Sequence, residues 1–243
     1  MPEVESTPFG ANFIRTAVCE LKYPTLLELD QGEPIEFQKA VRKIFPYYQR
    51  QKAIGLPGAP GETGIRYLFT SKDKRWTIAL KNSALSVETQ NYDSFEEMFG
   101  FIELTLNAMR PLMDADFFTR VGLRYVNAIV PNQTTIQASI NPRLLSTFDE
   151  GVFGAFQRHW TEIHGLTAGG KYLLRCGVPN REDVGEELEY ILDLDFSSED
   201  TPVMEAPEVV RKLHSDSFDL FWWCLGEDAK RWLLDSRKSG KTK

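Results

Sequence analysis

The sequence predicts an α+β fold in which one large, mostly antiparallel sheet carries two or three long helices packed on one face. Three consecutive strand-like segments are joined by connectors of hairpin length, which favours antiparallel pairing. The predicted order is strand, helix, three strands, helix, strand, three strands and helix. Strands and helices do not alternate along the chain, which argues against a parallel Rossmann-type sheet.

The first predicted elements are a strand and an amphipathic helix. Residues 14–23 alternate between apolar and polar side chains, as a half-buried strand does. Residues 34–45 begin at a proline and repeat apolar side chains at helical spacing. Residues 52–64 hold too many Gly and Pro for a regular element and predict a flexible loop. The expected inner face of the helix consists of Phe37, Val41, Ile44 and Phe45.

A strand meander and the clearest helix of the chain follow. Residues 65–71, 75–82 and 84–90 predict three strands in antiparallel succession. Residues 93–109 predict a helix in which Asp93 and Glu96 form a capping box. We expect its apolar stripe to belong to the core; the stripe comprises Phe95, Met98, Phe99, Ile102, Leu106 and Met109.

The second half repeats a similar order of elements. The predicted segments are a long strand at 116–130, a helical turn at 141–148, strands at 156–164, 171–178 and 188–196, and helices at 206–225 and 227–236. Gly226 is placed to cap the first of these helices, and a basic tail occupies 237–243. We interpret residues 1–243 as a single α+β domain, within which 12–137 and 138–236 could be two similar halves.

Composition limits the classes of function. The chain has 243 residues and a net charge of −7, which disfavours nucleic acid and anionic membranes as partners. Its three cysteines form no CxxC pair, which argues against a disulfide framework or a zinc site. No signal peptide or membrane-length apolar run is present, so we expect a cytoplasmic protein.

Several segments resemble, in their order, a family of uncharacterised bacterial and archaeal proteins of similar length that are distributed sporadically among genomes. These segments are "IRTAVCELKYP", "LKNSALSVETQNYDSFEEM", "RVGLRYVNAI", "LDLDF" and "LHSDSF". The resemblance covers most of residues 14–225, and "GLRYVN" is its most specific part. It implies no established activity, cofactor or catalytic residue. The patchy distribution of the family implies an accessory role such as antiviral defence.

No motif for catalysis stands out. The sequence lacks G-x-S-x-G, and neither His159 nor His164 is spaced from a second ligand as metalloprotease motifs require. His214 is expected to be a buried histidine with a backbone or acidic partner. Asp193 and Asp195 share one face of a predicted strand. They could contribute to a Mg²⁺ site, or they could pair with arginines.

The strand "TRVGLRYVN" places Arg120, Gly122 and Arg124 on one face and apolar residues on the other. The apolar face is expected to meet the helices. We expect Arg120 and Arg124 to pair with Asp193 and Asp195 across the sheet. Contact with an anion, a nucleic acid or a protein partner is the alternative. The glycine between the arginines lets a neighbouring group approach closely.

The segment "FDLFWWCL" near the end of the helix at 206–225 holds four aromatic residues, which cannot all face inward on one helix. Trp222 and Trp223 are either buried in the fold or a homodimer, or exposed as anchors for a partner.

Together these patterns favour a non-enzymatic protein-binding or regulatory protein without a cofactor. The family resemblance implies, in addition, that it is an accessory component of a defence system. Its partner would be a protein encoded by a neighbouring gene. The alternative that the chain forms a homodimer also remains. The expected contact residues are Trp222, Trp223, Arg120 and Arg124. The alternatives are a metal-dependent nuclease or phosphoesterase built on Asp193 and Asp195, and a nucleic-acid binder that uses the arginine face.

Overall fold

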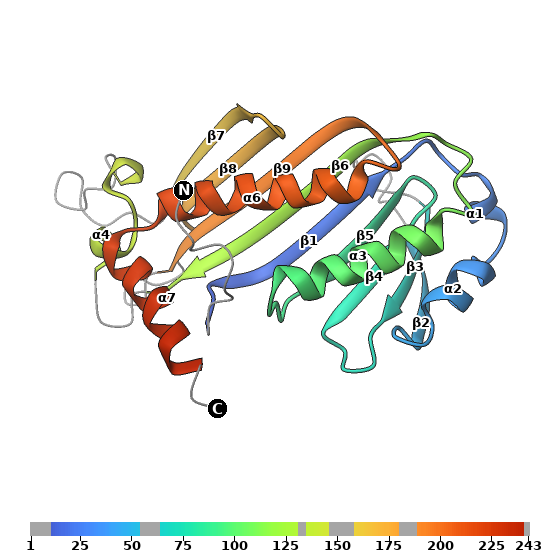
Figure 1. The fold of residues 1–243 in the computed structure, drawn as a ribbon, viewed down its shortest axis with the longest axis horizontal. Helices are drawn as coiled ribbons and strands as arrows, with labels where there is room; N and C mark the ends of the chain where they lie inside the picture. The colour runs from blue at the N-terminus through green and yellow to red at the C-terminus, as the bar shows by residue number, and fades with distance from the viewer. Residues whose placement is uncertain (1–10, 54–63, 131–134, 146–157, 180–188, 241–243) are drawn as a thin grey trace. The chain divides into compact units, whose positions relative to one another are not determined.

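The computed structural model describes residues 11–53, 64–130, 135–145, 158–179 and 189–240, with side chains up to residue 236. It shows a nine-stranded antiparallel sheet with helices packed against it (Figure 1), which confirms the predicted α+β fold. The strand order is β2-β3-β4-β5-β1-β6-β9-β8-β7. No helix in the described ranges combines the length and the apolar character needed to cross a membrane.

The strands are β1 (Ile14–Lys22), β2 (Tyr47–Ala53), β3 (Gly64–Thr70), β4 (Trp76–Leu80), β5 (Ala84–Thr89), β6 (Phe117–Ile129), β7 (His159–Thr167), β8 (Gly170–Val178) and β9 (Tyr190–Pro202). The helices are α1 (Glu28–Gln31), α2 (Ile35–Val41), α3 (Phe95–Met109), α4 (Ile136–Ser139), the 3-10 helix η1 (Pro142–Leu144), α6 (Ala206–Cys224) and α7 (Glu227–Gly240).

The chain connects its strands in the same way twice. After β1 come short helices, four strands and the long helix α3; after β6 come short helices, three strands and the long helix α6. In the first run, β5 precedes the long helix and lies next to β1, the first strand of the run. In the second run, β9 precedes the long helix and lies next to β6, the first strand of that run. The connectivity of the two runs therefore differs chiefly by the additional edge strand β2.

Two compact units divide the chain. Unit 1 comprises Met1–Arg15, Arg124–Phe196 and His214–Lys243, and unit 2 comprises Thr16–Leu123 and Ser197–Leu213. Each boundary falls inside an element, so β1, β6, β9 and α6 contribute residues to both units.

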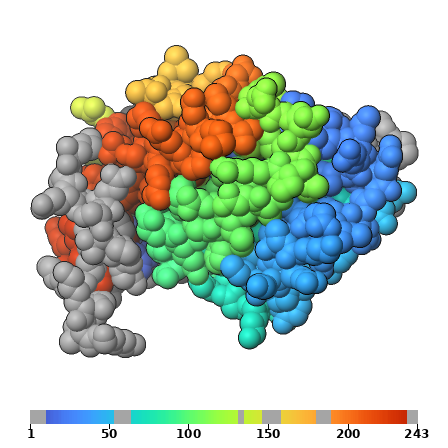
Figure 2. All heavy atoms as spheres, turned by 45° about the vertical axis from the view of Figure 1, so that its right-hand side comes forward, coloured from blue at the N-terminus to red at the C-terminus, as the bar shows by residue number. Residues whose placement is uncertain are grey.

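In unit 2, α3 lies across β4 and β5 (Figure 1) and closes an apolar core. The alternation predicted for β1 is confirmed, since Ala17, Cys19 and Leu21 are buried while their neighbours in sequence are more exposed. Residues of β5 opposite them, Leu85 and Val87, are buried on the same side. On the outside of this unit, the segment of α1 and α2 lies beside α3 (Figure 2).

The predicted cap of α3 is wrong by one residue. Ser94, not Asp93, adopts the extended capping conformation, and its side-chain oxygen accepts a hydrogen bond from the Glu97 amide at 3.2 Å. This satisfies one of the amides that have no partner in the first turn of a helix. Because the helix starts at Phe95, the amide that meets the cap belongs to Glu97 rather than Glu96. The Glu97 carboxylate pairs with Arg75.

Two further differences occur near the edge of the sheet. Strand β2 was not predicted, because "YYQRQKA" does not alternate between apolar and polar residues. An edge strand needs no such pattern, since it pairs on one side only. Helix α2 ends at Val41 rather than residue 45, and Ile44 is 43% exposed instead of buried.

Several predicted segments extend beyond the described residues. Of the predicted loop 52–64, residues 54–63 lie outside them, whereas Lys52 and Ala53 belong to β2 and Gly64 opens β3. The last residues of the predicted tail, 241–243, also lie outside, and α7 continues to Gly240 rather than ending at 236. Residues 146–148 of the predicted turn and residues 156–157 of the predicted strand also lie outside the described residues.

In unit 1, Gly226 allows two backbone segments to meet. Its amide donates a hydrogen bond to the Ser139 carbonyl at 2.8 Å. A Cβ atom on this glycine would lie 2.3 Å from the Ala138 carbonyl oxygen. Gly226 therefore does more than end α6, because it lets the turn between α6 and α7 pack directly against α4.

We expect Gly226→Ala to lower the free energy of unfolding by about 1–3 kcal/mol, because the added methyl group forces backbone to move. Gly122→Ala is a matched control. The atoms nearest to its methyl group would be those of the Arg120 guanidinium, which is the flexible end of a side chain. Urea unfolding of both variants measures the difference, and an equal loss of stability would contradict this account of Gly226.

Candidate functional site

In each unit a long helix packs on one side of the strands: α3 in unit 2, and the part of α6 that begins at His214 in unit 1 (Figure 1). Among the described residues of each unit, the other side carries neither long helix. On β6, the side chains of Val121, Leu123 and Tyr125 are buried. Because strand side chains alternate, Arg120 and Arg124 project from the other face, as predicted. We call this side the helix-free face.

In unit 1, Arg124 and Asp193 form a bidentate ion pair on the helix-free face. Nε and Nη2 of Arg124 each donate a hydrogen bond of 2.7 Å to a different carboxylate oxygen of Asp193. The Asp193 side chain is 8% exposed and that of Arg124 is 47% exposed. The hydrogen bonds and the negative charge of Asp193 raise the pKa of Arg124 above its ordinary value. The predicted pairing of these two residues is confirmed.

The ion pair extends into a row that crosses four strands of unit 1. Nη1 of Arg175, on β8, lies 4.0 Å from Asp193, and Nε of Arg175 donates a 2.7 Å hydrogen bond to Glu162 on β7. The other carboxylate oxygen of Glu162 lies 2.8 Å from Nε2 of His164. The hydrogen bonds from Arg175 and then His164 lower the pKa of Glu162 below its ordinary range. We call these five residues the charge row: Arg124, Asp193, Arg175, Glu162 and His164.

In unit 2, Arg120 contacts an acidic residue that the sequence analysis did not single out. Its Nη1 atom lies 3.3 Å from Oε1 of Glu20 on β1. Strand β6 lies between β1 and β9, so its arginines can reach acidic residues on either neighbouring strand. The pairing of Arg120 with an acidic residue of β9 stays a prediction. The Arg120 guanidinium folds over Gly122, where any side chain would collide with it. The glycine therefore makes room for its own neighbouring arginine.

These contacts leave the arginines with their charges compensated. Ion pairs on an open sheet face contribute about 1 kcal/mol or less each, because solvent screens them. Their larger effect is on register, since a slip of one residue would bring both arginines to the apolar side. Around β6, the helix-free face is therefore polar without being strongly basic.

The candidates for nucleophilic or metal chemistry are held in structural contacts. Burial raises the pKa of the Cys19 thiol to about 12 and also raises the pKa values of Cys176 and Cys224. Both carboxylate oxygens of Asp193 accept hydrogen bonds from Arg124, and Asp195 lies two residues away on the same strand face. Among the residues that the structure describes, no group of three or more potential ligands could hold a metal ion.

The histidines follow the sequence prediction in part. His159 and His164 lie on opposite faces of β7, as their spacing predicted. The Nδ1 atom of His214 lies 3.1 Å from the Tyr125 hydroxyl, and a backbone or acidic partner for this histidine stays a prediction. This contact joins α6 to the buried side of β6 within unit 1.

An aromatic cluster lies at the C-terminal end of α6. The rings of Phe218 and Trp222 are stacked with centroids 6.2 Å apart, and Nζ of Lys230 lies 5.8 Å from the Trp222 ring centroid. Trp222 is half-buried, whereas Trp223 is 40% exposed. The Trp223 carbonyl accepts a 2.7 Å hydrogen bond from Nδ2 of Asn141, which holds the backbone in place. We call Phe218, Trp222 and Trp223 the α6 aromatic cluster.

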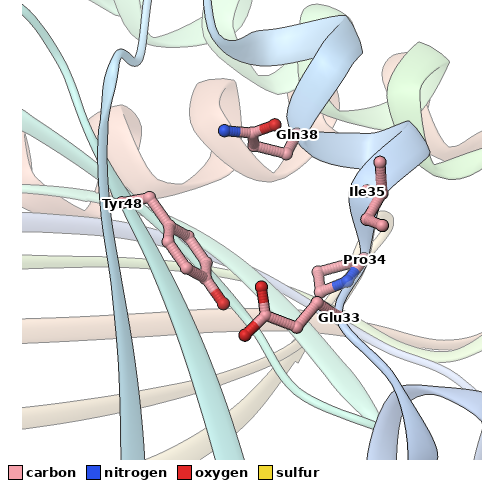
Figure 3. A pocket seen from close by; sticks show the side chains of 5 residues that line it. All are labelled: Glu33, Pro34, Ile35, Gln38 and Tyr48. Carbon is pink, nitrogen blue, oxygen red and sulfur yellow. The ribbon is translucent and has the colours of Figure 1, made fainter.

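Unit 2 contains a small pocket that the sequence did not indicate. Figure 3 shows the Tyr48 hydroxyl directed toward the Glu33 carboxylate, with Gln38 above them. Burial, followed by the charge of Glu33 and a hydrogen bond to it, raises the pKa of Tyr48. The pocket has a volume of about 90 Å³. Typical ligand sites hold about 300–1,000 Å³, so this one is too small for a drug-sized molecule.

Neither a comparison with models of known protein families nor a comparison with curated proteins finds a match for this sequence. The function must therefore be inferred from the surface itself.

Sequence reasoning missed most of the charge row. Glu162, His164 and Arg175 occupy alternate positions of β7 and β8 on the helix-free face, which is the signal that could have found them. The sequence contains no indication that these strands lie next to β9, so the row became visible only with the sheet order.

We expect Arg124→Ala to lower the free energy of unfolding by roughly 1–2 kcal/mol, because it removes the bidentate partner of a nearly buried carboxylate. Loss of one partner of a fully buried pair costs about 3–5 kcal/mol, and the exposure of Arg124 reduces that figure. Lys39→Ala is the control and should cost about 0.5 kcal/mol or less, since both side chains of its ion pair with Glu36 are exposed. Urea unfolding at neutral pH tests both, and equal effects would contradict the assignment.

Proposed function

We propose that this chain is a non-enzymatic protein-binding protein, and that its partner contacts the α6 aromatic cluster. The observation that carries the proposal is the partial exposure of Trp222 and Trp223 on a helix whose other face is buried. Tryptophan is enriched at the energetic centres of protein interfaces, because a large apolar ring is buried at a low entropic cost. The neighbouring Lys230 supplies a polar rim.

Arg120 and Arg124 are weaker candidates for this contact than the sequence indicated. Their guanidinium groups already interact with Glu20 and Asp193 within the sheet. A partner would gain little from them unless it displaced those carboxylates. They are better suited to the polar edge of an interface than to its centre.

The contacts of the same residues argue against the two alternatives. A metal-dependent nuclease would need Asp193 to release Arg124 before it could bind a cation. A nucleic-acid binder would need arginines whose charge is not compensated, on a chain with a net charge of −7. We therefore retain protein binding as the function that the contacts support best.

The resemblance to sporadically distributed bacterial and archaeal proteins supports a narrower proposal. We infer that the protein is a regulatory accessory component of an antiviral defence system and that a neighbouring gene encodes its partner. The cytoplasm is the proposed compartment, because the three cysteines are free thiols in the core.

The test is co-purification of tagged wild-type protein with the products of neighbouring genes. We expect the double variant Trp222→Ala/Trp223→Ala to bind the recovered partner about tenfold more weakly or worse, as truncation of interface tryptophans does. Trp232→Ala is a matched control, because Trp232 is also an exposed tryptophan, at 44%, and lies on α7. Unchanged binding by a folded double variant would overturn the assignment of the cluster.

Two binding measurements test the metal-dependent nuclease and the nucleic-acid binder. Isothermal titration of the wild-type chain with MgCl₂ and MnCl₂ should give no saturable heat, because Arg124 occupies the carboxylate of Asp193. Saturable binding that is lost in Asp193→Asn would instead favour the nuclease. Binding to DNA that weakens steeply as salt rises would favour the nucleic-acid reading.

A further inference from the structure

Strand β7 ends the sheet and is unusually exposed. It pairs with β8 from His159 opposite Val178 to Thr167 opposite Gly170, and it is the last strand in the sheet order (Figure 1). Within the described ranges no strand pairs with its outer edge. The backbone amides and carbonyls along such an edge can pair with another strand.

The edge also lacks the features that usually prevent strand addition. Natural edge strands are often protected by lysine, proline or short length. At the other end of the sheet, β2 carries Arg50 and Lys52. By contrast, β7 is nine residues long, "HWTEIHGLT", and contains no lysine, arginine or proline. Its apolar side chains are open to solvent, with Trp160 and Ile163 each 36% exposed and Leu166 78% exposed.

The sequence of β7 is complementary to itself in one antiparallel register. When two copies are placed about a two-fold axis at Ile163, residue 162 of one copy faces residue 164 of the other, and residue 160 faces residue 166. Glu162 then faces His164, and Trp160 faces Leu166. By symmetry each pair occurs twice.

All four of these side chains lie on the helix-free face, because they occupy alternate positions of the strand. Opposite side chains of an antiparallel pair lie on the same face, so the pairs can touch. A register centred on Glu162 would bring two carboxylates together. A register centred on His164 would place Glu162 opposite Leu166. Only the register centred on Ile163 matches both charge and apolar character.

We propose that the protein forms a symmetric dimer in which the β7 strands of two copies pair antiparallel about Ile163 and join their sheets. The occupant of the edge is a second copy rather than another protein because the complementarity lies within β7 itself. The charge row, which ends at Glu162 and His164 in one copy, continues into the same residues of the second copy. The proposal does not depend on the α6 aromatic cluster.

Cysteine cross-linking tests the register directly. Residues opposite each other in an antiparallel pair have Cα atoms about 4.5–5.5 Å apart, within the range of a disulfide. Ile163→Cys should therefore form a disulfide-linked dimer when the purified full chain is oxidised with diamide. The natural cysteines should stay unreactive, because all three are buried free thiols.

Two controls separate this register from random collision. Leu27→Cys introduces a thiol at an exposed site, 65% exposed, that precedes α1 and should not cross-link. Trp160→Cys and Leu166→Cys should not cross-link alone, since each lies about 20 Å from its own copy across the axis. A mixture of these two variants should cross-link. Cross-linking of Ile163→Cys no faster than Leu27→Cys overturns the proposal.

The mass in solution provides an independent measurement. Sedimentation of the wild-type chain should show a dimer. Leu166→Lys should raise the dissociation constant of the dimer about tenfold or more, because the two symmetric contacts between Trp160 and Leu166 are lost at once. Leu27→Lys, at an exposed leucine away from β7, should leave it unchanged. A wild-type chain that remains monomeric at its highest attainable concentration overturns the dimer, and so does a dimer that Leu166→Lys leaves equally stable.

Discussion

The two-residue period of β6 is the constraint on which the surface of this protein depends. Burial of Val121, Leu123 and Tyr125 leaves no freedom for Arg120 and Arg124, which must project from the opposite face. Two cations on a sheet face need compensation, and they obtain it from strands on either side of β6. Glu20 on β1 serves the first, and Asp193 on β9 serves the second. A slip of register would break both contacts and bring the guanidinium groups into the core.

The consequence for function is electrostatic. In unit 1, positive and negative side chains alternate from Arg124 through Asp193 and Arg175 to Glu162. A face built in this way attracts neither phosphate nor cation strongly. The contacts that we propose are instead apolar or weakly polar: the tryptophans at the end of α6 and the exposed side chains of β7. Burial of apolar area and strand pairing are the interactions by which such surfaces bind proteins.

Much of the fold was predictable because it is encoded locally. The strands of the meander, the long helices and the buried face of β6 follow from periodicity within about ten residues of chain. The errors arose where local signals compete or are absent. Asp93 and Ser94 are both good capping residues, and only the point at which the helix starts distinguishes them. Strand β2 lacks the apolar alternation of its neighbours because it is an edge, with one side unpaired.

The sequence by itself determined which side of each strand is apolar, where the long helices lie in the chain, and that Arg120 and Arg124 share one face. These properties depend on the order of neighbouring side chains. Only the tertiary structure decided which strands lie beside β6, and therefore that Arg120 meets Glu20 on β1. It also decided that β7 is the last strand of the sheet. Strand adjacency depends on contacts between segments that are far apart in the chain, and no local pattern of residues encodes it.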